Sequence, residues 1–138
     1  MRCYLDTNIL VYALFDADEL HTDTVAVMMD YENILLTSSV CVQELIHLCQ
    51  IGKLTGKKQS ISVGSLIGQI RDMNIGIVPV SEKHLETLTQ LPMFDDHRDP
   101  NDRLIIAQAI SDHIALISSD LKFDRYIPYG LDFIYNKR

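Results

Sequence analysis

Short apolar runs alternate with longer amphipathic stretches along this chain. The apolar runs are compact and bounded by polar residues, which is typical of buried strands, and they lie at residues 2–6, 33–37, 75–80 and 114–117. Residues 130–134 predict a further strand at an edge of the sheet. Strands separated by helices indicate right-handed crossovers and a mostly parallel sheet covered on both faces. The pattern therefore predicts an α/β fold.

Helical spacing fills the intervals between these strands. The clearest helix follows the hydroxyl residues 37–39, ends near Gly52, and carries Glu44 off its apolar stripe. That stripe has the i, i+3, i+4, i+7 spacing at Val42, Leu45, Ile46 and Cys49. Further helices are expected at residues 9–14, 22–31, 57–73, 82–88, 102–113 and 121–126, of which the one at 57–73 is weakened by an internal glycine.

Length and composition favour an ordinary folded protein. The 138 residues suit one domain with a single core, spanning residues 1–138, and 47% hydrophobic with 22% charged residues is close to the globular average. No apolar stretch approaches the roughly 20 residues that a membrane helix needs. Asp6 stands where a signal peptide would carry its apolar region, so we expect a soluble protein of the cytoplasm.

Cysteine usage and charge exclude two further classes. Cys3, Cys41 and Cys49 are odd in number and form no CxxC pair, so we expect small core residues rather than a disulfide framework or a cysteine zinc site. The 12 basic and 19 acidic residues give a net charge of −7, which argues against binding nucleic acid mainly through a basic surface. A metal-dependent nuclease remains compatible with this charge, because a bound divalent ion reverses the local field.

Four acidic residues fall where a parallel sheet delivers its loops to one edge. Asp6 and Asp120 follow apolar runs, Glu44 lies in the first turns of a helix, and Asp102 opens another helix. An open α/β sheet binds ligands outside the carboxyl ends of its strands. Two carboxylates about 4 Å apart repel by roughly 1 kcal/mol in water and about 4 kcal/mol at an effective dielectric of 20. Convergence of all four predicts a pocket for a divalent cation.

Each of these acids also has a structural interpretation, and the choice of metal depends on the donor set. Asp6 and Asp120 suit turn or helix-cap positions. Asp102, near a helix N-terminus, would stabilise that helix through its dipole by about 0.3 to 1 kcal/mol. His97 and His47 raise the question of zinc, but no histidine cluster of zinc-site spacing accompanies them. The oxygen-rich set favours Mg²⁺ or Mn²⁺.

Basic residues occur in two groups. Lys53, Lys57 and Lys58 form a local cluster that we interpret as a solvated helix face. The second group flanks the predicted acidic pocket and is a candidate for phosphate or RNA contact: Arg98, Arg103, Lys122 and Arg125.

Four motifs stand in order along the chain, at residues 4–8 (Tyr-Leu-Asp-Thr-Asn), 38–44, 97–109 and 116–120. Together they resemble the PIN domain family, with the VapC-type toxin ribonucleases as the nearest subgroup. The resemblance implies a three-layer α/β/α fold with a mostly parallel sheet of about five strands. It also implies Mg²⁺ or Mn²⁺ dependence, hydrolysis of RNA, a homodimer, and an antitoxin partner. By this resemblance Asp6, Glu44, Asp102 and Asp120 are the catalytic, metal-binding quartet.

The resemblance also assigns supporting residues. Asn8 matches a polar residue that supports the first acid, and Asp99 is a candidate for the same outer layer. Ser118 stands where the family commonly has threonine and keeps the hydroxyl. Asn101 departs from a position that is often aromatic in the family, so local packing or substrate contact differs there.

Activated water is the favoured nucleophile, because no Ser-His-Asp or Cys-His pairing has a recognisable setting. A metal would lower the pKa of its bound water, and Glu44 would orient or deprotonate that water. Two alternatives to a metal-dependent endoribonuclease stay open. One is a non-catalytic PIN-like binding module with structural acids. The other is an α/β phosphatase or phosphoacceptor, although the haloacid-dehalogenase type needs Asp-x-Asp and residues 6–8 read Asp-Thr-Asn.

Overall fold

A parallel five-stranded sheet forms the centre of the computed structural model, which describes residues 1–54 and 61–138. The strands are β1 (Arg2–Leu5), β2 (Ile34–Ser38), β3 (Ile75–Val78), β4 (Ala115–Ser118) and β5 (Phe133–Tyr135). They are ordered β3-β2-β1-β4-β5, and every neighbouring pair is parallel. The predicted sheet of about five strands is confirmed, with β5 at one edge.

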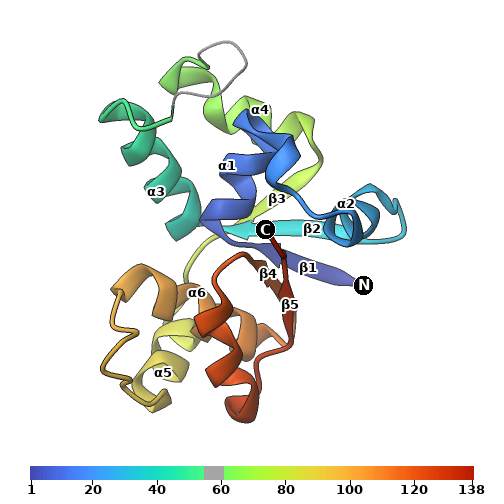
Figure 1. Ribbon diagram of the computed structural model, residues 1–138. Coiled ribbons are helices and arrows are strands. Elements are labelled where there is room, and N and C mark those ends of the chain that lie inside the picture. Colours follow the sequence, from blue (N-terminus) through green and yellow to red (C-terminus); the bar gives the residue numbers. More distant parts are fainter. Residues whose placement is uncertain (55–60) are drawn as a thin grey trace.

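Helices cover both faces of this sheet and complete a three-layer α/β/α fold. In Figure 1, α1, α3 and α4 lie on one side of the strands, and α5 and α6 lie on the other. The α-helices are α1 (Thr7–Phe15), α2 (Thr22–Met29), α3 (Ser39–Gln50), α4 (Leu66–Asp72), α5 (Glu82–Gln90) and α6 (Pro100–Asp112). The described residues also form three 3₁₀ segments: η1 (Ala17–Glu19) between α1 and α2, η2 (Val63–Ser65) before α4, and η3 (Leu121–Tyr129) between β4 and β5. Among the described residues, no helix is long and apolar enough to cross a membrane.

The central strand β1 and its neighbour β4 are the most deeply buried. All four residues of β4 are buried, as is β1 from Cys3 onward, because layers of helices cover both faces of these strands. Cys3 and Cys41 are buried in the core and Cys49 is partly buried, and all three are free thiols, as the sequence predicted.

The chain changes direction across the sheet at β1. It proceeds from β1 to β2 and β3 on one side and returns to β4 and β5 on the other. The carboxyl ends of β1 and β4 are therefore neighbours whose following segments diverge, and such a switch point leaves room for a ligand. Asp6 directly follows β1 and Asp120 follows β4 by two residues, so the topology brings both to this crevice.

Three predicted helix starts differ from the structure. The helix expected at residues 9–14 begins at Thr7, where Asp6 is its N-cap. The helix expected over residues 57–73 begins at Leu66 after η2, and residues 57–60 lie outside the described part of the chain. Ser62 and Ser65 explain the delay, because the Ser65 hydroxyl donates to the Ser62 carbonyl at 2.8 Å and competes with helical bonding. The helix expected from Asp102 begins at Pro100, a residue suited to a first helical position.

A buried polar network that we did not predict joins β1, α5 and α6. Tyr4 Oη donates to Asp112 Oδ2 at 2.6 Å, and His84 Nε2 lies 2.9 Å from both oxygens of that carboxylate. The backbone N–H of Ser81 donates to His84 Nδ1, so the ring proton resides on Nε2 and points at Asp112. Burial would raise the pKa of Asp112, but the hydrogen bonds from Tyr4 and His84 outweigh it and hold that pKa below its ordinary value.

Asp112→Ala is expected to lower the free energy of unfolding by about 2 to 4 kcal/mol at pH 7, because two buried donors lose their acceptor. The depressed pKa of Asp112 means that its contribution is present above about pH 4 and is lost as the pH falls through the folded-state pKa. Urea unfolding at pH 7 and at pH 3 measures both values. The exposed Asp95→Ala is the control, and equal stability of the two variants at pH 7 would refute the structural role.

Candidate metal centre

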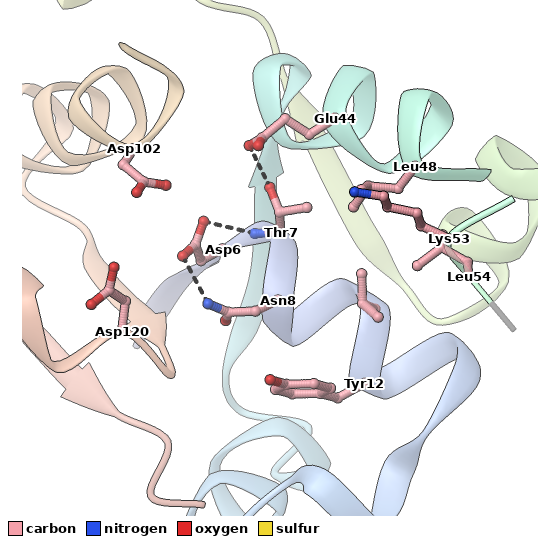
Figure 2. Close-up of a pocket in the computed structure, with 11 residues that line it drawn as sticks. Asp6, Thr7, Asn8, Tyr12, Glu44, Leu48, Lys53, Leu54, Asp102 and Asp120 are labelled. Carbon is pink, nitrogen blue, oxygen red and sulfur yellow. Dashed lines mark hydrogen bonds between the residues drawn. The ribbon is translucent and has the colours of Figure 1, made fainter. Parts of the chain in front are cut away.

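The four acids singled out in the sequence line one cavity of about 470 Å³ at the carboxyl edge of the sheet. Figure 2 shows Asp6, Glu44, Asp102 and Asp120 around this cavity. Each comes from a different segment: the β1–α1 junction, α3, the first turn of α6, and the β4–η3 junction. The structure therefore brings together carboxylates that are separated by up to 114 residues in sequence (120 − 6).

Asp6 is the most buried member, with 3% of its surface exposed. It is the N-cap of α1, and its carboxylate accepts the backbone N–H of Thr7 at 2.7 Å. The other carboxylate oxygen accepts the hydroxyl of Ser118 at 2.7 Å and the amide of Asn8 at 3.3 Å. Asp6 is thus both a helix cap and a fixed carboxylate at the cavity wall.

Ser118 links the first and last acids of the set. Its hydroxyl donates to Asp6 and accepts the backbone N–H of Asp120 at 3.0 Å. The amide of Asn8 also donates to the Ser118 hydroxyl at 3.3 Å, and its carbonyl oxygen accepts the N–H of Ser119 at 3.2 Å. The structure places Asn8 and Ser118 beside Asp6, where the resemblance had assigned them a supporting role, and that role stays a prediction.

Glu44 approaches from the opposite wall of the cavity. Its Oε1 accepts the hydroxyl of Thr7 at 2.8 Å, which ties α3 to the start of α1 (Figure 2). The rest of the lining is largely apolar and lies toward α1 and α3: Val11, Tyr12, Leu48 and Leu54. One end of the cavity is therefore acidic, and the other is largely apolar with Lys53 at its wall.

The carboxylates are crowded enough to shift their pKa values. Burial raises the pKa of Asp6 to about 6, with Glu44 and Asp120 adding to the rise against hydrogen bonds that lower it. Burial and then the neighbouring acids, Asp6 first, raise the pKa of Asp102 to about 8. Without a cation, these carboxyl groups resist ionisation because of burial and mutual repulsion. A hard divalent cation stabilises their ionised form and binds to their oxygens. The four acids of this cavity therefore offer the oxygen donors that such an ion needs.

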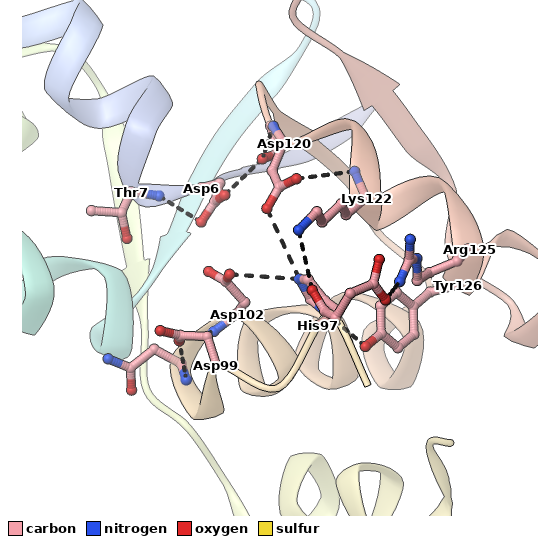
Figure 3. Close-up of polar contacts among 12 residues, drawn as sticks. Asp6, Thr7, His97, Asp99, Asp102, Asp120, Lys122, Arg125 and Tyr126 are labelled. Carbon is pink, nitrogen blue, oxygen red and sulfur yellow. Dashed lines mark hydrogen bonds and ion pairs between the residues drawn. The ribbon is translucent and has the colours of Figure 1, made fainter. Parts of the chain in front are cut away.

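His97 belongs to the same cluster, and sequence reasoning missed it. Its side chain is 3% exposed, and Nε2 lies 3.6 Å from Asp102 Oδ2 and 4.0 Å from Asp120 Oδ2. Figure 3 marks both contacts with dashed lines. One ligand atom from each of these three residues falls within 4.8 Å of the other two. Burial lowers the pKa of His97, although the charge of Asp120 opposes this. The search for zinc-site spacing failed because the partners of His97 are acids, one of which is distant in sequence.

Asp99 has a structural position at the edge of the cluster. It caps α6 by accepting the backbone N–H groups of Asn101 and Asp102 at 2.9 and 3.1 Å. Its charge also contributes to the raised pKa of Asp102. Asp99 thus fixes the helix end that carries Asp102 and acts on its ionisation from outside the cavity.

The four basic residues proposed for phosphate contact differ in their availability. Arg103 donates to the carbonyls of Leu91 and Pro92 at 3.2 Å, so its guanidinium fastens the segment after α5 instead of facing solvent. Arg125 pairs with Asp96, and Lys122 Nζ donates to the Asp96 carbonyl at 3.2 Å. Arg98 is exposed. Arg98 and Lys122 therefore remain the better candidates of this group.

Lys53 corrects our interpretation of the other basic group. Lys53 is exposed, as we expected, but it follows α3 instead of lying on a helix, and it lines the acidic cavity together with Leu54 (Figure 2). Lys57 and Lys58, the remaining members of that group, lie outside the described residues. The turn after α3 carries Lys53 back toward the site, which helical periodicity alone does not reveal.

Comparisons with known proteins identify a family and a shared fold. The PIN domain family model matches residues 3–127. A chain of VapBC2 from Rickettsia felis, solved bound to a DNA fragment from its promoter, is 25% identical with a TM-score of 0.72, covering 99% of this chain and 100% of that one. A chain of VapBC-1 from nontypeable Haemophilus influenzae is 19% identical with a TM-score of 0.68, and the match covers 100% of both chains. No curated protein matches the chain.

Proposed function

Because the chain belongs to the PIN domain family, a family generally composed of nucleases, we propose that it is a metal-dependent endoribonuclease and the toxin of a toxin–antitoxin pair. The observation that carries the proposal is the convergence of Asp6, Glu44, Asp102 and Asp120 on one cavity. Their sequence separation makes this arrangement hard to explain as four unrelated helix caps. The likeness to the Rickettsia felis VapBC2 chain supports the toxin assignment.

The positions of the side chains suggest a division of work. Asp6, Asp102 and Asp120 would hold Mg²⁺ or Mn²⁺, which supplies charge neutralisation and a water of lowered pKa when bound. Asp6 is fixed for this by Ser118 and the Thr7 N–H. Glu44, oriented by the Thr7 hydroxyl, would accept a proton from the attacking water. Lys53, at the cavity wall, would contact the RNA phosphates.

The experiment is incubation of purified full-length protein with total RNA and Mg²⁺ or Mn²⁺, followed by mapping of the new RNA ends. We expect a small set of cleavage sites that a chelator abolishes. The mapped ends would also show whether the substrate is structured or single-stranded RNA. The acids do not determine this, because surface contacts select the RNA. Intact RNA after incubation with protein that demonstrably binds Mn²⁺ would contradict the proposal.

A homodimer and an antitoxin partner complete the proposal. Tyr12, Leu48 and several apolar neighbours on α1 to α3 are only partly buried. Large apolar side chains at the α2–β2 turn are more exposed, with Met29 at 77% and Tyr31 at 94%. Apolar surface of this kind marks protein contacts.

Light scattering is expected to give a mass of twice 15.7 kDa for the purified chain. Burial of apolar surface between two copies supplies the stabilisation. Measurement across micromolar concentrations with Tyr31→Ser as a comparison would show whether the α2–β2 turn takes part. A strictly monomeric mass at every concentration would contradict the homodimer.

A further inference from the structure

His97 has no role in the function proposed above, yet its side chain is among the most constrained near the cavity. Its Nε2 atom is buried and has no hydrogen-bond partner among the described residues. A buried imidazole nitrogen without a partner is costly, so it needs an explanation. The atom faces Asp102 and Asp120, both of which line the cavity (Figure 3).

Neighbouring aromatic side chains hold the ring in this orientation. Nδ1 lies 2.8 Å from the hydroxyl of Tyr126, which is itself buried. The ring packs edge to face against Tyr126 and Phe123, with centroid distances of 5.3 and 5.5 Å. A flip of the imidazole would break the contact with Tyr126 and turn carbon toward the carboxylates. Nε2 is therefore directed at the two acids by its surroundings.

The distances from Nε2 to the carboxylates argue against direct hydrogen bonds. The values of 3.6 and 4.0 Å lie beyond the usual N–H···O range of about 2.7 to 3.2 Å, and beyond the 3.3 Å of the hydrogen bond from Asn8 to Asp6. Two atoms that each lie about 2.1 Å from one shared ion are separated by at most about 4.2 Å. The spacing thus suits three groups that share an ion better than it suits a histidine bonded to its neighbours.

We propose that His97 Nε2 is a nitrogen ligand of the divalent ion held with Asp102 and Asp120, and that it makes the site prefer Mn²⁺ to Mg²⁺. Nδ1–H then donates a hydrogen bond to the Tyr126 hydroxyl, as the second ring N–H of a metal-bound histidine commonly does. This inference rests on the proposed function for the existence of the ion, and adds a ligand that the acidic quartet does not include.

The chemistry of the donor set gives the preference its direction. Mg²⁺ favours oxygen ligands and keeps several waters, whereas imidazole nitrogen suits first-row transition ions. A site with carboxylates alone would discriminate weakly between Mg²⁺ and Mn²⁺. With His97 included, removal of the imidazole should weaken Mn²⁺ binding and leave Mg²⁺ binding little changed.

Pulsed electron paramagnetic resonance of the full-length protein loaded with Mn²⁺ alone tests the ligand directly. The wild-type protein should show hyperfine coupling to ¹⁴N, and His97→Gln should lose it. Glutamine is a matched variant, because its amide can still donate toward the carboxylates but offers no imidazole nitrogen. His47→Gln, which removes an exposed histidine on α3, should keep the coupling.

Calorimetric titration gives the second readout. His97→Gln should raise the Kd for Mn²⁺ by at least the roughly 10- to 100-fold that loss of an outer partner costs, with a much smaller change for Mg²⁺. Tyr126→Phe keeps the imidazole and removes its hydroxyl partner, so it should retain the ¹⁴N coupling and bind Mn²⁺ more weakly. This variant keeps the inference testable if His97→Gln does not fold.

Two results would overturn the inference. One is the absence of ¹⁴N coupling in the wild-type protein, and the other is an unchanged Mn²⁺ to Mg²⁺ affinity ratio in folded His97→Gln. Neither result would contradict the proposed function, which is tested separately. That function stands if the wild-type protein cleaves RNA with a divalent ion and Asp6→Asn does not. If the wild-type protein fails to cleave RNA but shows the ¹⁴N coupling, the nuclease function is contradicted. The assignment of His97 as a metal ligand is then supported.

Discussion

Replacing Asp6 by asparagine is expected to lower metal-dependent RNA cleavage by at least about a hundredfold. Asp6 is the most buried acid of the cavity and the one held by the largest number of hydrogen bonds. Asparagine keeps its size and can still accept the Thr7 N–H, so the helix cap survives while the negative charge is lost. The rate of cleavage of a defined RNA under saturating Mn²⁺ is the measurement.

The matched control is Asp23→Asn, which removes a carboxylate whose side chain is 93% exposed at the start of α2. It should cleave at the wild-type rate. Circular dichroism and urea unfolding establish that both variants fold. Equal cleavage by wild-type protein and folded Asp6→Asn would mean that the acids of this cavity are structural, and the non-catalytic binding module would become the better interpretation.

Asp102→Asn is expected to change stability and activity in opposite directions. Burial and the surrounding acids raise the pKa of Asp102 to about 8, so its ionised form opposes folding when no cation is bound. Removing the charge should therefore stabilise the metal-free protein by on the order of 1 to 3 kcal/mol at pH 8.5. The same variant should lose RNA cleavage, because a carboxylate of the proposed centre is gone.

The pH dependence follows from the sign of the shift. An acid whose folded-state pKa is raised destabilises the fold progressively as the pH rises from its unfolded value, near 4, through its folded value. The difference between chelated wild-type protein and Asp102→Asn should thus be small at pH 4.5 and largest at pH 8.5. Saturating Mn²⁺ should reverse it, since a ligand at 100 times its Kd stabilises by about 2.7 kcal/mol.

Urea unfolding of the wild-type protein and Asp102→Asn, in chelator and in Mn²⁺ and at both pH values, measures the four differences in the free energy of unfolding. Asp124→Asn, an exposed acid on η3, is the control and should show neither the gain nor the reversal. If Asp102→Asn in chelator is less stable than the wild type at pH 8.5, the claim that repulsion among the cavity's carboxylates destabilises the metal-free protein is contradicted.

Much of this architecture follows from local signals in the sequence. The strands are short apolar runs that a parallel sheet buries on both faces, so β1 and β4 could be predicted without knowing their neighbours. The acids could be predicted to converge because a parallel sheet sends every following segment to the same edge. Asp6 and Asp120 fall directly at that edge.

The rest depends on contacts between distant segments. His97 approaches Asp120 only because the loop before α6 packs on η3 through Tyr126 and Phe123. Arg103 looks like a phosphate ligand in the sequence, but the carbonyls that occupy it come from the end of α5. Periodicity describes a single element, and it carries no information on such packing between elements.

An anomalous-difference map from crystals grown with Mn²⁺ tests the central claim most directly. The account predicts an ion in the acidic cavity, bounded by carboxylate oxygens of Asp6, Asp102 and Asp120. Mn²⁺ density confined to other parts of the surface would contradict a metal-dependent nuclease centre at this edge of the sheet.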